Sequence, residues 1–379
     1  MLRFQKKHLC TTLLLALLVC TSCIKDEALN AEADILTCTV SKEIMKREPV
    51  IENDKIMVMV NADADLKHQA PEFTLTPGAT IEPASGTERD FTTPQHYTVT
   101  SEDGNWKKVY TVAFIIAGIS TDFSFENVRK YEKKNYTYDI FFDEDLATGN
   151  VIDWATGNPG YALTGMGTPD PTSFPTSSHL DGVRGKCVKL ETKSTGQFGA
   201  DLGMPIAAGN LFMGNFDVMS ALKSPLNATR FGLPFEHVPT YIRGYYKYKP
   251  GEVYTEKGQP VPGKQDTWDI YGIFYEVTPG VSYIDGSVME DKYTHPNLVS
   301  VALLEEKDRK DADEWTEFYI PFVMKPGKAI DREKLKNGGY NVALVFTSSL
   351  YGSYFNGAPG STLYLDEVEL IYMNDNDIK

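Results

Sequence analysis

The chain has 379 residues, enough for two folded domains, and 52 acidic against 37 basic residues give it a formal net charge of −15. A chain this acidic is a poor candidate for binding nucleic acid or anionic membrane surfaces, which need clustered cations, whereas neutral ligands remain open. Its 21 tyrosines, 19 phenylalanines, 30 glycines and 21 prolines favour strands and turns over helices.

Residues 1–22 have the pattern of a signal peptide. A basic start that includes Arg3 is followed by an apolar stretch, residues 9–19, which is too short to span a bilayer. Ser22 and Cys23 then resemble the cleavage box of bacterial lipoproteins, and the following Ile-Lys-Asp-Glu resembles the signal that sends Bacteroidetes lipoproteins to the outer face of the outer membrane. We therefore predict a lipid anchor on Cys23. An ordinary secretory peptide is the alternative.

Few cysteines remain after such processing. Cys38 and Cys187 fall in different predicted domains, so a disulfide between them is not expected, and two isolated cysteines form no metal site. We predict that both are small buried residues.

A polar tether, residues 23–34, leads into a first predicted domain at 35–118. Its predicted strands are 56–60, 73–79, 97–100 and 108–114. Short strands at this spacing indicate a small β-sandwich. One segment of this domain resembles the immunoglobulin-like modules of Bacteroidetes surface proteins; it reads Thr-Pro-Gly-Ala-Thr-Ile-Glu-Pro-Ala-Ser-Gly. We interpret this domain as a spacer, because no group of its residues carries chemistry.

The second predicted domain covers residues 121–379 and is all-β. Its predicted strands are 187–191, 242–248, 268–277, 298–304, 315–321, 342–346 and 363–372, with short helices only at 331–335 and within 214–223. Many strands joined by long loops, notably 155–186 and 249–266, are typical of a jelly roll.

Several segments of this second domain occur together in a known family. They are Phe-Ser-Phe-Glu-Asn at 123–127, Trp-Ala-Thr-Gly-Asn-Pro-Gly at 154–160, Gly-Asn-Leu-Phe-Met-Gly-Asn-Phe at 209–216, Pro-Phe at 234–235 with Tyr-Tyr-Lys-Tyr at 245–248, Thr-Ser-Ser at 347–349, and Gly-Ala-Pro-Gly-Ser-Thr-Leu-Tyr-Leu-Asp-Glu-Val at 357–368. In this order they resemble the putative carbohydrate metabolism domain of Bacteroidetes. The resemblance implies a lipid-anchored, glycan-related protein with a jelly-roll fold, but it does not establish an activity.

The strand 241–248 carries the most informative pattern. At period two, Ile242, Gly244, Tyr246 and Tyr248 share one face that can pack a core, whereas Tyr241, Arg243, Tyr245 and Lys247 share the other. Rings beside charged donors suit a sugar, because a ring covers its apolar C–H patch and the charged donors bind hydroxyls. The alternative is a tyrosine-rich strand whose Lys and Arg extend to solvent.

A second strand, 268–276, alternates in the same way. Its residues Asp269 and Tyr271 share a face, and if this strand pairs near 241–248, they join Arg243, Tyr245 and Lys247 on one concave surface. A salt bridge from Asp269 to Lys247 or Arg243 is the alternative role for that carboxylate. Trp154, Asn158 and Ser348 are further candidates for ring stacking and hydroxyl contacts.

Catalysis and metal binding need carboxylates. A glycoside hydrolase requires two facing carboxyl groups, for which Glu236, Asp269 and Glu276 are candidates. Strand alternation places Glu276 on the opposite face of the strand from Asp269. No cofactor is expected. Glu126 and Asp366 are candidates for a structural calcium that joins the two ends of the domain.

Three functions therefore remain open. The leading hypothesis is a cell-surface lipoprotein that binds an oligo- or polysaccharide beside outer-membrane glycan-uptake proteins. The second is a glycoside hydrolase on the same fold. The third is a structural surface protein or adhesin, which predicts a large exposed apolar patch in place of a pocket.

Overall fold

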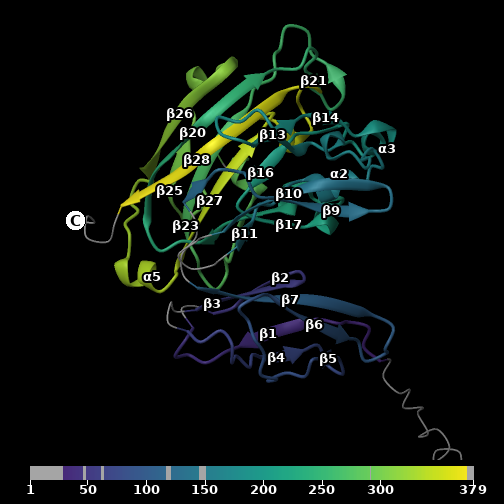
Figure 1. Cartoon of the computed structure of the whole chain (residues 1–379), viewed down its shortest axis with the longest axis vertical. Helices are drawn as coiled ribbons and strands as arrows, with labels where there is room; N and C mark the ends of the chain where they lie inside the picture. The colour runs from purple at the N-terminus through teal and green to yellow at the C-terminus, as the bar shows by residue number, and fades with distance from the viewer. Residues whose placement is uncertain are drawn as a thin grey trace, which may run out of the picture.

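The computed structural model describes residues 29–45, 48–60, 64–116, 121–144, 151–290 and 292–373. The predicted signal peptide and Cys23 lie outside these residues. No helix in the described ranges has the length and apolarity needed to cross a membrane. The prediction of an all-β chain is confirmed, with an immunoglobulin-like sandwich followed by a larger jelly roll (Figure 1).

The N-terminal domain is a small sandwich of two sheets. Its strands are β1 (Ile35–Thr39), β2 (Val50–Glu52), β3 (Lys55–Val60), β4 (Glu72–Leu75), β5 (Thr80–Glu82), β6 (Gln95–Thr100) and β7 (Lys107–Ile116). One sheet is β1-β4, and the other has the order β2-β3-β7-β6-β5, in which β3 and β7 are parallel. Alternating residues such as Ile56, Val58, Tyr97 and Val99 are buried between the sheets, as period two predicts.

The C-terminal domain is built from many more strands. They are β8 (Asp122–Phe123), β9 (Val128–Lys133), β10 (Tyr136–Glu144), β11 (Val151–Asp153), β12 (Thr176–His179), β13 (Cys187–Glu191), β14 (Lys193–Ser194), β15 (Ile206–Ala207), β16 (Asn210–Phe212), β17 (Gly214–Phe216), β18 (Thr229–Phe231), β19 (Leu233–Pro234), β20 (Val238–Lys249), β21 (Thr255–Glu256), β22 (Gln259–Pro260), β23 (Asp269–Glu276), β24 (Ile284–Asp285), β25 (Leu298–Leu303), β26 (Ala312–Met324), β27 (Tyr340–Thr347) and β28 (Thr362–Met373). Short helices connect them: α2 (Asn158–Ala162), α3 (Gly196–Asp201), α4 (Val218–Ala221), α5 (Arg332–Lys336), and the 3-10 helices η1 (Pro171–Ser173), η2 (Pro225–Ala228), η3 (Gly286–Met289), η4 (Glu306–Asp308) and η5 (Gly352–Tyr354).

The main strands form two layers that share one long strand. The first layer, here called the β20 sheet, has the order β12-β13-β28-β20-β26, and the second, the β23 sheet, has the order β26-β25-β23-β27-β16. The first part of β26, from Ala312 to Pro321, pairs with β20. Its end, from Phe322 to Met324, pairs with β25. This strand therefore belongs to both layers and joins them at one edge.

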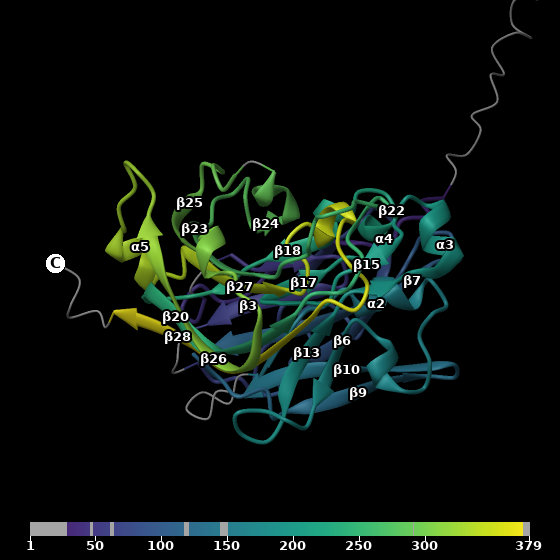
Figure 2. The same cartoon turned by 90° about the horizontal axis from the view of Figure 1, so that it is seen from above.

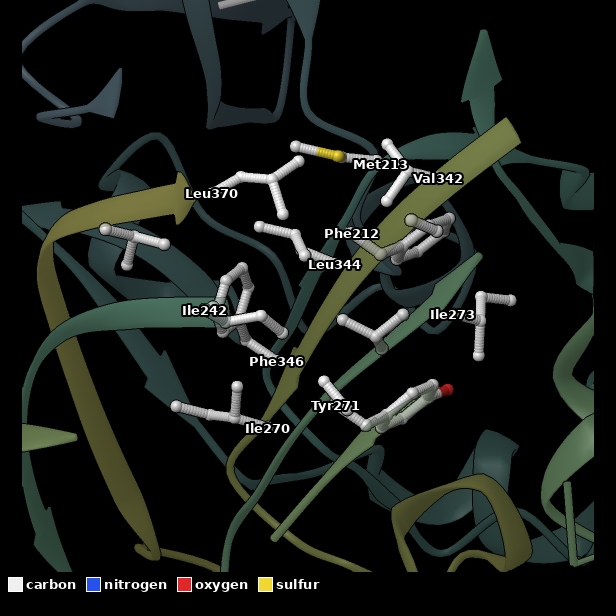
Figure 3. Close-up of a cluster of buried hydrophobic side chains, with 14 of the residues drawn as sticks. Phe212, Met213, Ile242, Ile270, Tyr271, Ile273, Val342, Leu344, Phe346 and Leu370 are labelled. Atoms are coloured by element: carbon white, nitrogen blue, oxygen red, sulfur yellow. The ribbon is translucent and has the colours of Figure 1, made fainter. Parts of the chain in front are cut away.

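The core lies between these two layers. Ile242 of the β20 sheet meets Ile270 and Phe346 of the β23 sheet, and Figure 3 shows these side chains gathered together. Gly272 allows the two layers to approach closely here, since a Cβ at this position would come within 2.7 Å of Ile242 Cδ1. Even-numbered residues from Ile242 to Tyr248 of β20 and along β23 therefore face the space between the layers. The odd-numbered Tyr271, Ile273 and Tyr275 lie on the other face of β23, where they are also buried.

Both cysteines are buried and unpaired, as predicted. Burial raises the pKa of the Cys38 and Cys187 thiols to about 12, so neither forms a thiolate at neutral pH. We interpret both as packing residues.

A buried carboxylate near the start of the C-terminal domain makes stability depend on pH. Burial raises the pKa of Asp143 to about 6, while its hydrogen bond from Trp154 Nε1, at 2.6 Å, acts in the opposite direction. The folded chain therefore binds more protons here than the unfolded chain does between about pH 4 and pH 6. The stability that the fold gains from the raised pKa of Asp143 is complete below that pH window and is lost as the pH rises through it.

We expect the variant Asp143→Asn to remove this dependence, because an amide oxygen can still accept from Trp154 but does not titrate. Relative to the variant, the wild type should lose on the order of 2–3 kcal/mol of unfolding free energy between pH 4 and pH 6. Urea unfolding at a series of pH values measures the difference. Parallel pH profiles for the two proteins would contradict the assignment.

Candidate functional site

The outer face of the β20 sheet carries rings and cations, as the period of β20 predicts. Ile242, Tyr246 and Tyr248 are buried, whereas Arg243 and Lys247 remain partly accessible. The exposed set, which we call the ring-and-cation face, comprises Tyr241, Arg243, Tyr245 and Lys247 of β20, Trp315, Glu317 and Tyr319 of β26, and Tyr364 of β28. These strands lie side by side in Figure 1.

Ion pairs hold the cations of this face in place. Arg243 Nε donates to Glu317 Oε1 at 2.6 Å, and its Nη1 lies 3.6 Å from Glu369 Oε2. Lys247 Nζ lies 3.5 Å from Asp181 Oδ2 and 4.9 Å from the centre of the Trp315 ring. Because these pairs are partly exposed, they add little to stability, but they fix the positions of charged donors and acceptors.

The rings of this face include residues that the sequence did not single out. Tyr319 is 55% exposed and stacks on Tyr241 at 4.4 Å between ring centres. Trp315 and Tyr319 alternate with the buried Phe318 and Ile320 along β26, so the same period-two test would have found them. Tyr364 lies opposite Lys247 in the sheet register.

The predicted joining of β23 to this surface is wrong. β20 lies between β28 and β26, whereas β23 lies between β25 and β27 in the other layer. Since Ile242 and Gly272 both face the space between the two layers, Tyr245 and Tyr271 lie on the opposite, outer faces of their two sheets. Asp269 and Tyr271 therefore share a face, as predicted, but not the face that carries Arg243.

Asp269 is paired with an arginine of its own layer. Its side chain is buried, and Oδ1 accepts from Arg309 Nε at 3.0 Å, with Nη2 of the same guanidinium at 2.9 Å. Burial raises the pKa of Asp269 to about 6, while Arg309 acts against this rise. A salt bridge was the alternative role for this carboxylate, and it is observed with Arg309 and not with Lys247 or Arg243.

Tyr271 lines a pocket of about 200 Å³ on the outer face of the β23 sheet. Phe212, Tyr271 and Val345 are neighbours in the register of β16, β23 and β27 and form its floor. The short helices α2, α3, α4, η2, η3 and η5 contribute residues to its walls. Figure 2 shows β26 and β20 toward one side of the domain and β18 and α4 toward the other.

Three other predicted contact residues are buried, and this corrects their expected placement. Trp154 packs against Phe123 and Phe125 with its Nε1 bonded to Asp143. Asn158 exchanges two hydrogen bonds with the backbone of Thr176.

Ser348 is also enclosed, between Thr192 Oγ1 at 2.8 Å and the amide of Gly209 at 2.9 Å. The polar atoms of Ser348, like those of Trp154 and Asn158, form hydrogen bonds inside the fold. None of the three side chains therefore presents its polar atoms to solvent. A stretch rich in Gly and Ser gave no signal that its polar side chains would be needed inside.

The structure separates two of the three candidate catalytic carboxylates and places none of them among the described residues of the pocket lining. Asp269 and Glu276 lie at the two ends of the eight-residue strand β23, and Glu276 pairs with Lys334. Glu236 lies in the turn between β19 and β20 and is partly buried. None of the three lines the pocket, and the described residues of its lining include no Asp or Glu.

Glu126 and Asp366 are close to the same loop, residues 182–186. Glu126 Oε1 accepts from the amide of Lys186 at 2.9 Å, and Asp366 Oδ2 accepts from the amide of Arg184 at 3.1 Å. The Lys186 ammonium also donates to the Glu126 carbonyl at 2.9 Å. These hydrogen bonds anchor the loop to both carboxylates.

Burial also raises the pKa of Asp366 to about 6. Among the residues that the structure describes, no group of three or more His, Cys, Asp or Glu side chains is placed to hold a metal ion. Calcium binding by this chain remains a prediction.

The fold and its surfaces define a class: a two-domain β protein whose jelly roll has both an exposed ring-bearing face and a pocket. Comparison with protein families gives the family. The model described as "Putative carbohydrate metabolism domain" matches residues 124–371, and the model described as "SGBP, N-terminal" matches residues 35–113. The chain belongs to the putative carbohydrate metabolism domain family, and its predicted resemblance to that family is confirmed.

Two solved structures are similar over long stretches. A putative glycoside hydrolase from Bacteroides thetaiotaomicron is 52% identical, with a TM-score of 0.79 over 93% of this chain and 100% of that one. Another putative glycoside hydrolase, from Bacteroides vulgatus, is 42% identical, with a TM-score of 0.65 over 68% of this chain and 100% of that one. No curated protein matches the chain. The protein is therefore carbohydrate-related.

Proposed function

We propose that this protein is a cell-surface lipoprotein that binds a glycan on the ring-and-cation face of its jelly roll. The observation that supports this proposal best is the combination of partly exposed rings and fixed charges on one outer sheet face. Tyr319, with Tyr241 beneath it, and Trp315 offer surfaces for the C–H patches of sugar rings, while Arg243 and Glu317 offer donors and acceptors to hydroxyl groups.

The family matches support the same proposal. SGBP denotes a surface glycan-binding protein, and its N-terminal domain matches the first domain of this chain. The predicted lipid on Cys23 would hold the chain at the outer membrane. From there the first domain would act as a spacer, and glycan-uptake proteins would be its neighbours.

Glycoside hydrolysis is the second candidate, since both similar crystal structures carry that description. The described part of the pocket lining has no acidic side chain, and this favours binding over hydrolysis at that place. Release of reducing sugar from a bound polysaccharide would establish the hydrolase instead.

The variant Trp315→Ala tests the binding face. We expect it to weaken binding of a polysaccharide ligand at least about tenfold, because loss of a Trp at the centre of a binding surface commonly costs 2 kcal/mol or more. Affinity electrophoresis against host and plant polysaccharides identifies the ligand, and calorimetry measures the change.

Trp106→Ala is the matched control, because Trp106 is 64% exposed on the N-terminal domain and should leave affinity unchanged. Absence of any polysaccharide ligand would overturn the proposed function. Unchanged affinity in Trp315→Ala would overturn the assignment of this face.

A further inference from the structure

The pocket on the β23 sheet has a lining that differs in kind from the ring-and-cation face. Among the residues that the structure describes, its lining includes no Asp, Glu, Lys, Arg or His side chain. Large apolar residues dominate it, including Leu163, Phe198, Leu202, Met204 and Phe216. Sugars need several hydrogen-bonding partners, whereas such walls favour a group with few polar atoms.

The mouth of the pocket exposes apolar side chains to solvent. Leu163 is 45% exposed, Phe198 51%, Leu202 49% and Leu222 44%, and all four line the pocket. Single exposed apolar residues are ordinary on a protein surface. Four around one opening form an apolar patch, and covering that patch with a ligand is favourable.

The walls are held in place without a ligand. Asp217 caps α4 by accepting from the amides of Met219 and Ser220, and it also pairs with Arg230 at 2.7 Å. On the other wall, Thr195 Oγ1 donates to the carbonyl of Met204 at 2.5 Å and so closes the turn that follows α3. A pocket with braced walls is typical of a ligand site that exists before binding.

One polar group of the lining has no partner. The hydroxyl of Ser353, in η5, is buried and makes no hydrogen bond with any part of the chain that the structure describes. A buried hydroxyl without a partner costs free energy that a ligand can recover by supplying one.

We propose that this pocket binds an uncharged, largely apolar group about the size of one aromatic ring, with one polar atom that bonds to the Ser353 hydroxyl. Size supports this class, since an apolar cavity of about 150 Å³ accommodates benzene and this pocket holds about 200 Å³. A group of this kind can be an aryl or a short alkyl substituent on a larger molecule. The inference is independent of the proposed function, because it rests on a different face and on different residues.

Saturation-transfer NMR on the mature chain tests the pocket with two probes, 4-methylphenol for a ring and 1-hexanol for a chain. We expect at least one to bind with a Kd on the order of 1 mM or tighter. The tighter probe identifies which substituent the pocket prefers. Failure of both probes to bind would overturn the proposal.

The double variant F198S/L202S locates the binding. Both side chains are about half exposed, so the variant should fold, as circular dichroism can verify, and it should weaken probe binding at least fivefold. Met219→Ser is the matched control, since Met219 is 69% exposed nearby but does not line the pocket. Probe affinity that survives in the double variant, or is lost in Trp315→Ala, would place the binding elsewhere and overturn the assignment.

Discussion

Replacing Asp269 with alanine is expected to lower the free energy of unfolding by about 3–5 kcal/mol. The Arg309 guanidinium would then lose its carboxylate and keep, among its contacts with the described residues, the carbonyl of Leu304 at 3.0 Å. Its side chain is 14% exposed, so water cannot fully replace the lost partner. Urea unfolding at pH 8, above the raised pKa of Asp269, measures the loss with the carboxylate charged in the wild type.

The double variant D269L/R309M provides the control, because it removes both charges and fills the space with apolar atoms. Replacing a whole buried pair in this way is often neutral or stabilising, so most of the lost stability should return. An Asp269→Ala variant that unfolds like the wild type would show that the pair is not structural. Loss of carbohydrate turnover in Asp269→Asn without loss of stability would instead favour the hydrolase.

Replacing Trp268 with alanine should cost about 3–5 kcal/mol of unfolding free energy, because it removes a large buried ring. Trp268 is fully buried, and its ring centre lies 4.2 Å from that of Tyr246 on the opposite layer. Its Nε1 also donates to the carbonyl of Lys310 at 3.1 Å. Guanidinium unfolding measures the effect.

Trp106→Ala serves as the reference here too, because the exposed ring of Trp106 should contribute within about 0.5 kcal/mol. A loss below about 1 kcal/mol for Trp268→Ala would mean that the two layers do not depend on this contact. It would then also weaken the argument that Tyr246 faces the core.

Alternation along single strands was enough to predict which residues of β20 face inward. Ile242, Tyr246 and Tyr248 are buried, while Arg243 and Lys247 are partly accessible. The same rule assigned Asp269 and Tyr271 to one face of β23. The alternation of side chains along a strand shows which of them share a face of that strand. It carries no information on which strands become neighbours in a sheet.

Neighbour order is where the prediction failed. β20 and β23 are consecutive long strands, yet each pairs with strands from later in the chain, such as β28 and β27. The loop residues Trp154 and Asn158 failed for another reason: their partners, Asp143 and Thr176, lie elsewhere in the chain and bring them inside. Trp315 and Tyr319 could have been found, because their strand was predicted and alternates clearly.

The placement of Tyr245 and Tyr271 on opposite outer faces of the sandwich makes this domain bivalent if both surfaces bind. A small ligand cannot contact the two at once, so a ligand on one face should leave the affinity of the other face unchanged, and neither should compete with the other. A polymer with binding groups along its length could instead join two copies of the protein, one through each face. Avidity at a crowded cell surface would then depend on the spacing of those groups as much as on the strength of either contact.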